Sequence, residues 1–346
     1  MMRNNGKSMK KAFSKDLATI CFVVLIYAVI STMLYGGLAS RQLTNMIIPV
    51  SCYIVLAVSL NLVVGLLGEL SLGHAAFMSV GLFSGCLFSM WTVNAFPLFI
   101  RLPISMIFGG LFAALVGLVV GLPALRLKGD YLAIVTLACG EIIKTLITSF
   151  EITGGPLGLS TNNADAFIYS KPKTLLPFAM ILVFLTVIVM MNIKKSKHGR
   201  AIMAIRDNRI AAEATGVNVT YYKLIVFMLA AFFAGAAGVI YGHSLANIKS
   251  TTFDYNMSIE ILVIVVLGGM GSINGSIIAA IALTALPEML RGFDKYRMLA
   301  YSVLLIAIML LNSNSKFTEF KSRFNIKNLA KKFLNKKAVQ GGQVNE

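Results

Sequence analysis

The sequence predicts an all-α fold, a polytopic transmembrane helical bundle of about ten spans, and three observations support this prediction. Of the 346 residues, 57% are hydrophobic and only 13% are charged, whereas a soluble domain carries about 25% charged residues. The mean hydropathy is +0.80. The apolar residues also gather in runs of roughly twenty, the length that a helix needs to cross a bilayer. Lipid is therefore the expected solvent for much of the surface.

Ten apolar runs are candidate spans. They lie near residues 17–35, 46–67, 72–91, 104–122, 131–149, 174–192, 222–244, 258–267, 276–290 and 298–312. The eighth is short and the ninth is interrupted by Pro287 and Glu288, so a re-entrant or broken helix is the alternative for each. Division near residues 150–173 would give two groups of five, and an odd number per group would orient two related halves oppositely as inverted repeats. The halves share no convincing sequence identity, so the repeat is a hypothesis.

The basic residues predict which side of the membrane each loop faces. With the N-terminus inside, Lys and Arg concentrate in the predicted cytoplasmic segments, as the positive-inside rule requires. These segments are residues 1–16, 68–71, 123–130, 193–221, 268–275 and 313–346. Both termini are thus predicted to be cytoplasmic. The expected parts of the chain are a basic cytoplasmic N-terminus (1–16), a transmembrane domain (17–312) with a cytoplasmic loop (193–221), and a basic cytoplasmic tail (313–346).

Two structures suit the basic tail. Phe317, Phe320 and Phe324 recur at helical spacing among Lys and Arg, as in a helix that lies in the membrane interface. A solvated, disordered tail agrees equally well with this composition.

The sequence lacks the motifs of nucleic-acid binding, nucleotide hydrolysis and metal or nucleophilic catalysis. The net charge of +17 comes from basic residues at the chain ends and between apolar runs, and these are not interleaved with base-stacking aromatics. Gly6-Lys7-Ser8 lacks the glycine that a P-loop needs five positions earlier, where Met1 stands. The dinucleotide pattern starting at Gly269 fails because it ends on Asn274. The His and Cys residues show no ligand spacing. We therefore predict no catalytic residue, no metal site and no cofactor bound by this chain.

The cytoplasmic loop 193–221 is predicted to contain a short amphipathic helix from Arg200 to Ala214, with Gly216 as its C-terminal stop. Its apolar stripe would consist of Ile202, Ile205, Ile210 and Ala214. Its polar contacts would come from Arg206, Asp207, Arg209 and Glu213. Such a helix suits docking into a groove on a cytoplasmic partner. It suits a helix lying on the inner leaflet as well, and periodicity alone does not separate the two.

Two charged residues of the fifth span are candidates for function, because an ionisable group inside a membrane is costly. Glu141 and Lys144 lie three residues apart, so they share one helix face and can pair. The pair would line a pathway or gate for a substrate. The alternative is an internal ion pair that holds the bundle together.

A short turn between the second and third spans holds another polar group. Glu69 and His74 flank Ser71 and Gly73 there. A re-entrant helix N-terminus at this turn would present N–H groups to a substrate carboxylate. A turn with close glycine packing is the alternative.

Four stretches and the cytoplasmic loop carry a resemblance to a known family. The stretches are Leu60–Gly65 continuing through Leu70–Phe77, Lys128–Leu137 with Glu141–Ile143, Thr153–Leu159, and Leu267–Ser272 with Gly275. Over about residues 44–312 the chain resembles the LivM-type permeases of branched-chain amino-acid ABC importers. Glu213-Ala214-Thr215-Gly216 resembles the EAA-type coupling motif of bacterial importer permeases. The Gly-rich fourth stretch is shared with permeases for urea and simple sugars, and Glu69 departs from the family pattern, in which a neutral Gln is usual.

The resemblance implies a multi-pass permease subunit of a bacterial inner membrane that moves branched-chain amino acids inward by alternating access. Implied partners are two cytoplasmic ATPase subunits that use ATP and Mg, a second LivH-like permease and an extracytoplasmic substrate-binding protein, besides membrane lipid. The candidates for ATPase coupling are Arg200, Arg206, Asp207, Glu213 and Gly216. The candidates for the translocation pathway are Asn61, Glu69, Ser71, His74, Glu141 and Lys144. The candidates for contact with the binding protein are Thr153, Gly154 and Gly155, in the loop 150–173.

Other functions compete with this interpretation. The nearest is an ABC permease for urea or another small solute. A secondary transporter driven by an ion gradient would need an intramembrane relay, for which Glu141, Lys144 and Glu288 supply little material. A passive channel or a membrane scaffold would act without an ATPase.

Overall fold

The computed structural model describes residues 3–36, 40–127, 129–160 and 172–289, with residues 296, 299, 302, 303 and 306 beyond them. The chain divides into two compact units, Met1–Ala285 and Leu286–Glu346, and the first contains almost all of the described residues. Within the described residues the secondary structure is helical apart from two short strands. The all-α prediction is therefore confirmed. The basic tail, residues 313–346, lies outside the described residues.

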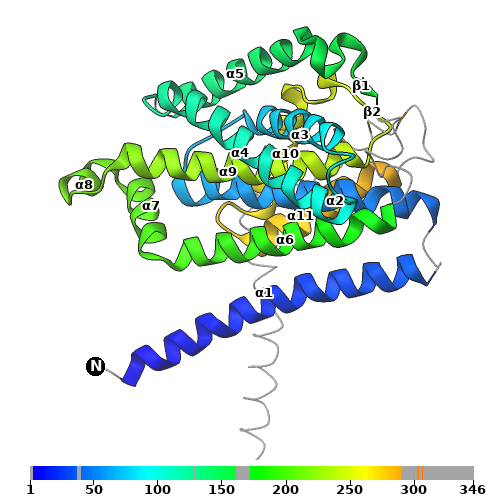
Figure 1. Cartoon of the computed structure of the whole chain (residues 1–346). Coiled ribbons are helices and arrows are strands. Elements are labelled where there is room, and N and C mark those ends of the chain that lie inside the picture. Colours follow the sequence, from blue (N-terminus) through cyan, green and yellow to red (C-terminus); the bar gives the residue numbers. More distant parts are fainter. Residues whose placement is uncertain are drawn as a thin grey trace, which may run out of the picture. The chain divides into compact units, whose positions relative to one another are not determined.

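The elements follow one another in the order shown by colour in Figure 1. The α-helices are α1 (Arg3–Tyr35), α2 (Arg41–Asn61), α3 (His74–Trp91), α4 (Leu98–Ala124), α5 (Asp130–Ser149), α6 (Pro172–Lys195), α7 (Lys197–Asp207), α8 (Arg209–Ala214), α9 (Val219–His243), α10 (Tyr255–Gly268) and α11 (Ile273–Met289). A π-helix, η1 (Leu62–Leu67), continues α2, and three 3-10 turns are η2 (Glu151–Thr153), η3 (Gly155–Leu157) and η4 (Ser250–Thr252). The strands β1 (Leu159–Ser160) and β2 (Asn247–Ile248) pair antiparallel, with Leu159 opposite Ile248.

Six helices are long and apolar enough to cross a membrane. They are Leu43–Leu67, His74–Trp91, Leu98–Ala124, Asp130–Ser149, Lys173–Lys195 and Val219–His243. They match the second to seventh predicted spans within a few residues. Shorter apolar helices, Thr19–Tyr35, Tyr255–Gly268 and Ile273–Pro287, match the first, eighth and ninth predicted spans. The tenth lies mostly outside the described residues, so the total of ten and the inverted repeat stay predictions.

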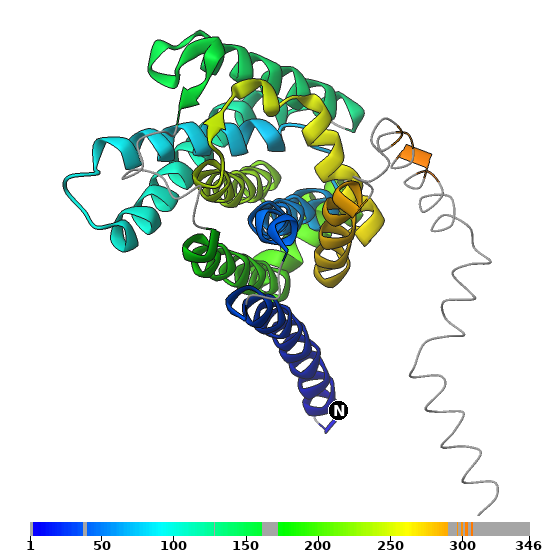
Figure 2. The ribbon, with the colours of Figure 1, turned by 90° about the vertical axis from the view of Figure 1, so that its right-hand side faces the viewer.

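The core of the first unit lies around α2 and α9, which Figure 2 shows end-on among their neighbours. α9 packs against α2, α3, α4 and α6. Small residues allow the close approach: a Cβ on Gly81 of α3 would lie 2.2 Å from the Cα of Gly235 of α9. Only a hydrogen fits between these two helices at that point, so the glycines set their separation.

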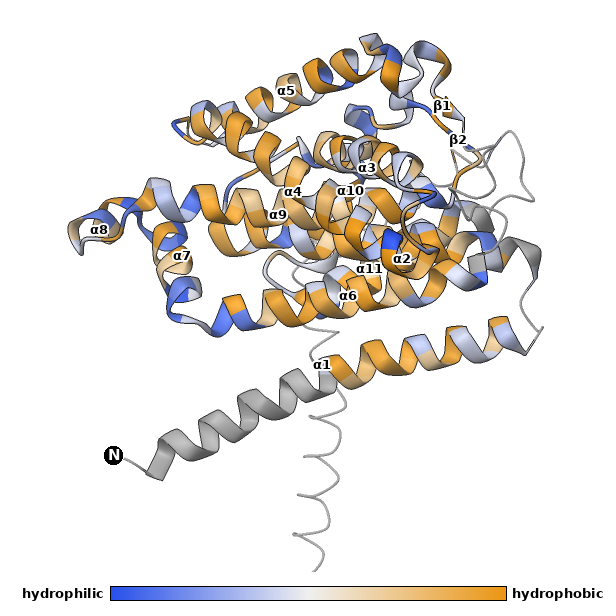
Figure 3. Ribbon diagram, viewed as in Figure 1, coloured by the Kyte–Doolittle hydropathy of each residue, from blue (hydrophilic) through white to orange (hydrophobic). Residues whose placement is uncertain are grey.

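Segments that the basic residues placed on one side of the membrane lie together at one end of this bundle. Arg206 of α7 donates from Nη1 to the carbonyl of Gly65, at 2.9 Å. Lys194, at the end of α6, donates to the carbonyl of Gly271 at 2.6 Å. The paired strands mark the opposite end (Figure 1). Hydrophilic residues are concentrated on α7 and α8, and apolar residues along the long helices (Figure 3). We call the end that carries α7 and α8 the coupling end.

The predicted single helix from Arg200 to Ala214 is wrong in one respect: it is two helices, α7 and α8. The break is at Asn208, whose backbone is extended, with φ −156° and ψ 106°. Its side chain accepts a hydrogen bond from Ala211 N at 3.1 Å, so it caps α8 in place of continuing α7. The predicted apolar stripe is split as a result. Ile202 and Ile205 are buried, whereas Ile210 is 80% exposed.

Gly216 ends α8 as predicted. Its φ is +84°, a left-handed conformation that glycine adopts without steric cost. Val217 N donates to Ala212 O at 3.1 Å across this turn, which satisfies one of the last carbonyls of the helix.

Candidate functional site

The fifth helix, α5, is the least buried of the six long apolar helices. Only 22% of its apolar window is buried inside the chain, against 50% to 78% for the other five. Its exposed apolar side chains include Tyr131, Ile134, Ile142 and Leu146. Such a face suits lipid or another subunit.

Glu141 and Lys144 form an ion pair on α5, so the predicted pairing is confirmed. Their spacing of three residues places both side chains on one helix face. The side chains are 35% and 23% exposed respectively. The pair is therefore neither sealed in the core nor freely exposed.

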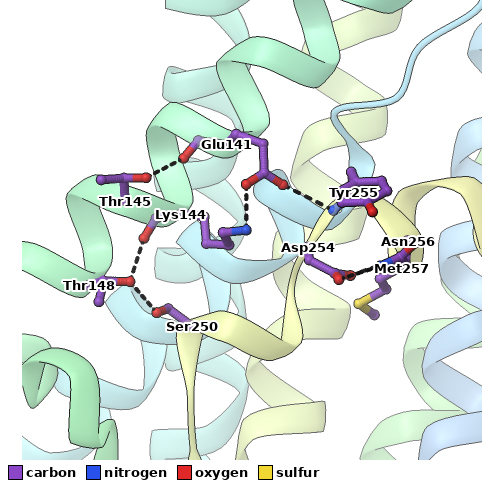
Figure 4. A network of polar contacts seen from close by, with 9 residues as sticks. All are labelled: Glu141, Lys144, Thr145, Thr148, Ser250, Asp254, Tyr255, Asn256 and Met257. Atoms are coloured by element: carbon purple, nitrogen blue, oxygen red, sulfur yellow. Dashed lines mark hydrogen bonds and ion pairs between the residues drawn. The ribbon is translucent and has the colours of Figure 1, made fainter.

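Glu141 also fixes α5 to the beginning of α10, as Figure 4 shows. Its Oε1 accepts a hydrogen bond from Tyr255 N at 3.1 Å. Asp254 caps the same helix, accepting from Met257 N at 3.1 Å. Two carboxylates thus face the positive end of the α10 dipole. The ion pair was predictable from the sequence, but the contact with α10 was not, because the partner is a backbone N–H that carries no side-chain signal.

A second contact joins the same two segments nearer the strand pair. The hydroxyls of Thr148 and Ser250 lie 2.6 Å apart. Together with the Glu141 bond, it links α5 to the segment that leads into α10 (Figure 4). Chemically, this arrangement offers one anion and one cation, side by side, on a helix face that the chain itself leaves partly open.

Two N–H groups at the turn between η1 and α3 bind side-chain hydroxyls of the same chain. Leu72 N donates to Thr136 Oγ1 at 3.0 Å, and Ala75 N donates to Ser258 Oγ at 3.2 Å. His74 is the first residue of α3 and is buried, with Nε2 2.8 Å from Ser59 Oγ. The geometry is that of a turn held by side chains of the same chain. Of the first N–H groups of α3, which were expected to face a substrate carboxylate, that of Ala75 binds the hydroxyl of Ser258.

Glu69 forms an ion pair with Lys223, the buried cation of α9. The Lys223 side chain is 2% exposed and that of Glu69 15%. Within the described residues, Glu69 Oε2 and Ser71 Oγ are buried without a hydrogen-bond partner. The sequence analysis missed this pair, because the partners lie 154 residues apart and no local pattern joins them. The negative charge of Glu69 thus has a cation within the same chain.

Asn61, the last residue of α2, binds the Gly-rich turn between α10 and α11. Its Oδ1 accepts from Gly271 N at 2.7 Å. Its Nδ2 donates to Ser276 Oγ at 2.8 Å and to Ser272 O at 3.1 Å. Asn61 is 2% exposed, so it acts as a buried clamp between two segments of the coupling end.

The predicted coupling residues all lie on the exposed surface of α7, α8 and the turn that follows α8. Asp207 pairs with Arg206 at 3.2 Å, and Glu213 pairs with Arg209 at 3.0 Å. Arg200 is exposed and donates to Lys195 O at 3.3 Å. Arg206 differs from them, because its guanidinium reaches back to the membrane helices. The helix α8 therefore projects an exposed, mixed polar and apolar tip.

The predicted contact residues for a binding protein are only partly available. The Thr153 side chain is buried and donates to Ile147 O at 2.5 Å and Phe150 O at 2.7 Å. It shapes the turn and is not a contact surface, which corrects that part of the prediction. Exposed side chains of this segment belong to Ile152 and Leu157, which the sequence analysis did not single out.

Comparison with known proteins decides the family. Residues 42–313 match the family model described as "Branched-chain amino acid transport system / permease component". The chain belongs to this family.

No group of three or more potential metal ligands exists in the part of the chain that the structure describes.

Individual relatives agree with the family assignment. The permease is 32% identical to the high-affinity branched-chain amino acid transport system permease protein LivM of Escherichia coli K12, over 89% of this chain and 77% of the relative. It is 34% identical to the protein of the same name from Salmonella typhimurium, over 79% and 69%. It is also 23% identical to the ribose import permease protein RbsC of Haemophilus influenzae, over 89% and 97%. No solved structure matches this chain.

Proposed function

We propose that this chain is the permease subunit of an ABC importer that moves branched-chain amino acids into the cytoplasm by alternating access. The family and the two LivM relatives support the substrate class. The α7–α8 pair is the observation that supports the coupling role. Arg206 anchors α7 to the bundle, and α8 projects from it as an exposed tip. As a multi-pass protein of the inner membrane, with both termini in the cytoplasm and ten spans, it would present this tip to cytoplasmic partners.

Two ATPase subunits would supply the energy, and ATP and Mg would bind to them. This chain would bind no cofactor of its own. Exposed Ile210 and the charged Glu213 lie on α8, so the tip offers an apolar and a polar contact together. A short helix with that composition fits a groove on a partner. Asp207 and Arg200 would add contacts along α7.

A second, LivH-like permease would cover α5. The low burial of this helix leaves an apolar face that a second subunit would pack against. The translocation pathway would then run beside α5, with Glu141 and Lys144 as its charged lining. The extracytoplasmic binding protein would dock near η2 and η3, at exposed Ile152 and Leu157.

Transport by the complete complex in proteoliposomes tests the proposal. We expect ATP-dependent accumulation of radiolabelled leucine, isoleucine and valine, with ribose and urea as poor competitors. The matched control replaces the P-loop lysine of the ATPase subunit, which removes nucleotide coupling and leaves the permease unchanged. Selective ATP-driven uptake of ribose or urea would refute the substrate. Uptake that persists without ATP while an ion gradient is present would show a secondary transporter instead.

A further inference from the structure

The π-helix η1 is an unusual feature at the coupling end. All six of its residues, Leu62–Leu67, are buried. Gly68, which ends this helix with φ +79°, and Glu69 both donate from their N–H groups to Val63 O, Glu69 at 3.3 Å. The Gly65 carbonyl is one of the last four of the helix, which have no partner within it, so it is free for another donor. Short π-helices are rare and frequently occur at functional sites.

Arg206 donates a hydrogen bond to the Gly65 carbonyl. Its Nη1 lies 2.9 Å from Gly65 O, and its Nε and Nη2 bind Asp207 Oδ1 at 3.3 Å and 3.2 Å. The guanidinium is therefore held at two sides, by the π-helix and by its own helix α7. Its side chain also passes against Gly68, where a Cβ would lie only 2.5 Å from Arg206 Cγ.

The same π-helix is clamped to the turn before α11. Gly65 has no space for a side chain, since a Cβ would lie 1.9 Å from Asn61 Oδ1 and 2.3 Å from Gly271 N. Asn61 and Lys194 each bind Gly271, through its N–H and its carbonyl respectively. A continuous set of hydrogen bonds thus joins α7, the π-helix and the Gly271 turn.

We propose that Arg206 is a positioning residue that transmits the movement of α7 to the membrane helices through the Gly65 carbonyl. In this mechanism α7, the π-helix and the Gly271 turn move as one body, and the exposed surface of α8 receives the ATPase. The sequence predicts Arg206 as a contact of the ATPase, and the structure adds a partner inside the chain, the Gly65 carbonyl. The inference rests on the proposed function, because it requires an ATPase that moves α7.

The first experiment measures uptake and ATP hydrolysis together in proteoliposomes that contain the complete complex. For Arg206→Met we expect assembly and hydrolysis to persist, while substrate taken up per ATP falls about tenfold, within the range of coupling changes measured at such networks. The control is Lys197→Met, which removes one positive charge from the exposed first residue of the same helix. The control should keep the wild-type ratio, and Arg206→Lys should recover part of it.

Each other outcome has a distinct meaning. An unchanged ratio in Arg206→Met would overturn the proposal. Loss of the ATPase from a permease that is still inserted would overturn it too, because Arg206 would then be a docking residue. Wild-type vesicles without ATP-driven uptake would instead refute the proposed function.

A cross-link tests the one-body movement directly. A Cβ placed on Gly68 would lie 3.5 Å from Arg206 Cβ, a separation that a disulfide spans. In a background with the four native cysteines replaced by Ala, Arg206→Cys alone should uncouple the complex. Gly68→Cys combined with Arg206→Cys should regain coupling on oxidation and lose it again after a reductant is added. Oxidation that blocks uptake would show that α7 moves against the π-helix and would overturn the proposal.

Discussion

The buried ion pair between Glu69 and Lys223 gives the sharpest stability prediction. Lys223→Met removes the cation and leaves the carboxylate of Glu69 in a site that is 15% exposed. Breaking one partner of a buried pair costs about 3–5 kcal/mol. The partial exposure of Glu69 places the expected loss near the lower end of that range. Glu69→Gln should cost a similar amount, because it leaves the Lys223 ammonium, which is 2% exposed, without its counter-ion.

The double variant tests whether the two residues stabilise the protein as a pair. With Glu69→Gln and Lys223→Met combined, no uncompensated charge remains, and replacing a buried pair by neutral groups is often close to neutral. The expected loss is about 1 kcal/mol, far below the sum of the two single losses. The assay is the unfolding free energy in mixed micelles, measured by titration with a denaturing detergent.

An exposed pair provides the control. Arg209 and Glu213 lie 3.0 Å apart on α8, with side chains 34% and 49% exposed, so Arg209→Met should cost only about 0.3–0.5 kcal/mol. Additive losses from the two Glu69 and Lys223 variants would refute the reasoning. They would show that the two side chains stabilise the protein independently and not as a pair.

Three further predictions concern transport and packing. Glu213→Ala or Gly216→Pro should leave the chain inserted but abolish ATP-coupled uptake in vesicles. The reason for Gly216→Pro is that proline cannot adopt the φ of +84° found at Gly216. Normal transport by either variant would contradict the coupling role of the loop. Glu141→Gln and Lys144→Met should each reduce maximal uptake while leaving assembly with the second permease intact, as checked by co-purification, and an unchanged uptake rate would remove the pair from the pathway. Asn61→Ala should lower the unfolding free energy by about 2–3 kcal/mol, because Gly271 N and Ser276 lose buried partners, and a loss below 1 kcal/mol would show that water replaces the amide.

The transmembrane helices were predictable because their signal is local. A run of apolar residues such as Leu98–Ala124 must form a helix, because a backbone in contact with lipid has to satisfy its hydrogen bonds within the helix. The pairing of Glu141 with Lys144 was predictable for the same reason, as the two residues share one helix face.

The contacts at the coupling end were not predictable from local patterns. Lys223 meets a partner 154 residues away, and Arg206 binds a backbone carbonyl 141 residues away in the last turn of the π-helix. The break at Asn208 was missed because the stretch from Arg200 to Ala214 as a whole is rich in Ala, Arg and Glu, which favour one continuous helix. A single side chain, acting as a cap, decided otherwise.

The coupling end and the helix α5 are held to the rest of the bundle in different ways, and this difference bears on which of them can move. At the coupling end, hydrogen bonds from the side chains of Asn61, Arg206 and Lys194 join segments from α2, α7 and the Gly271 turn. By contrast, α5 is mostly unburied and meets the α10 segment through the Glu141 and Thr148 bonds. Elements with little buried surface open at the lowest free energy. The proposed alternating access would therefore displace α5, together with a second permease packed on it, against a coupling end that moves as one piece.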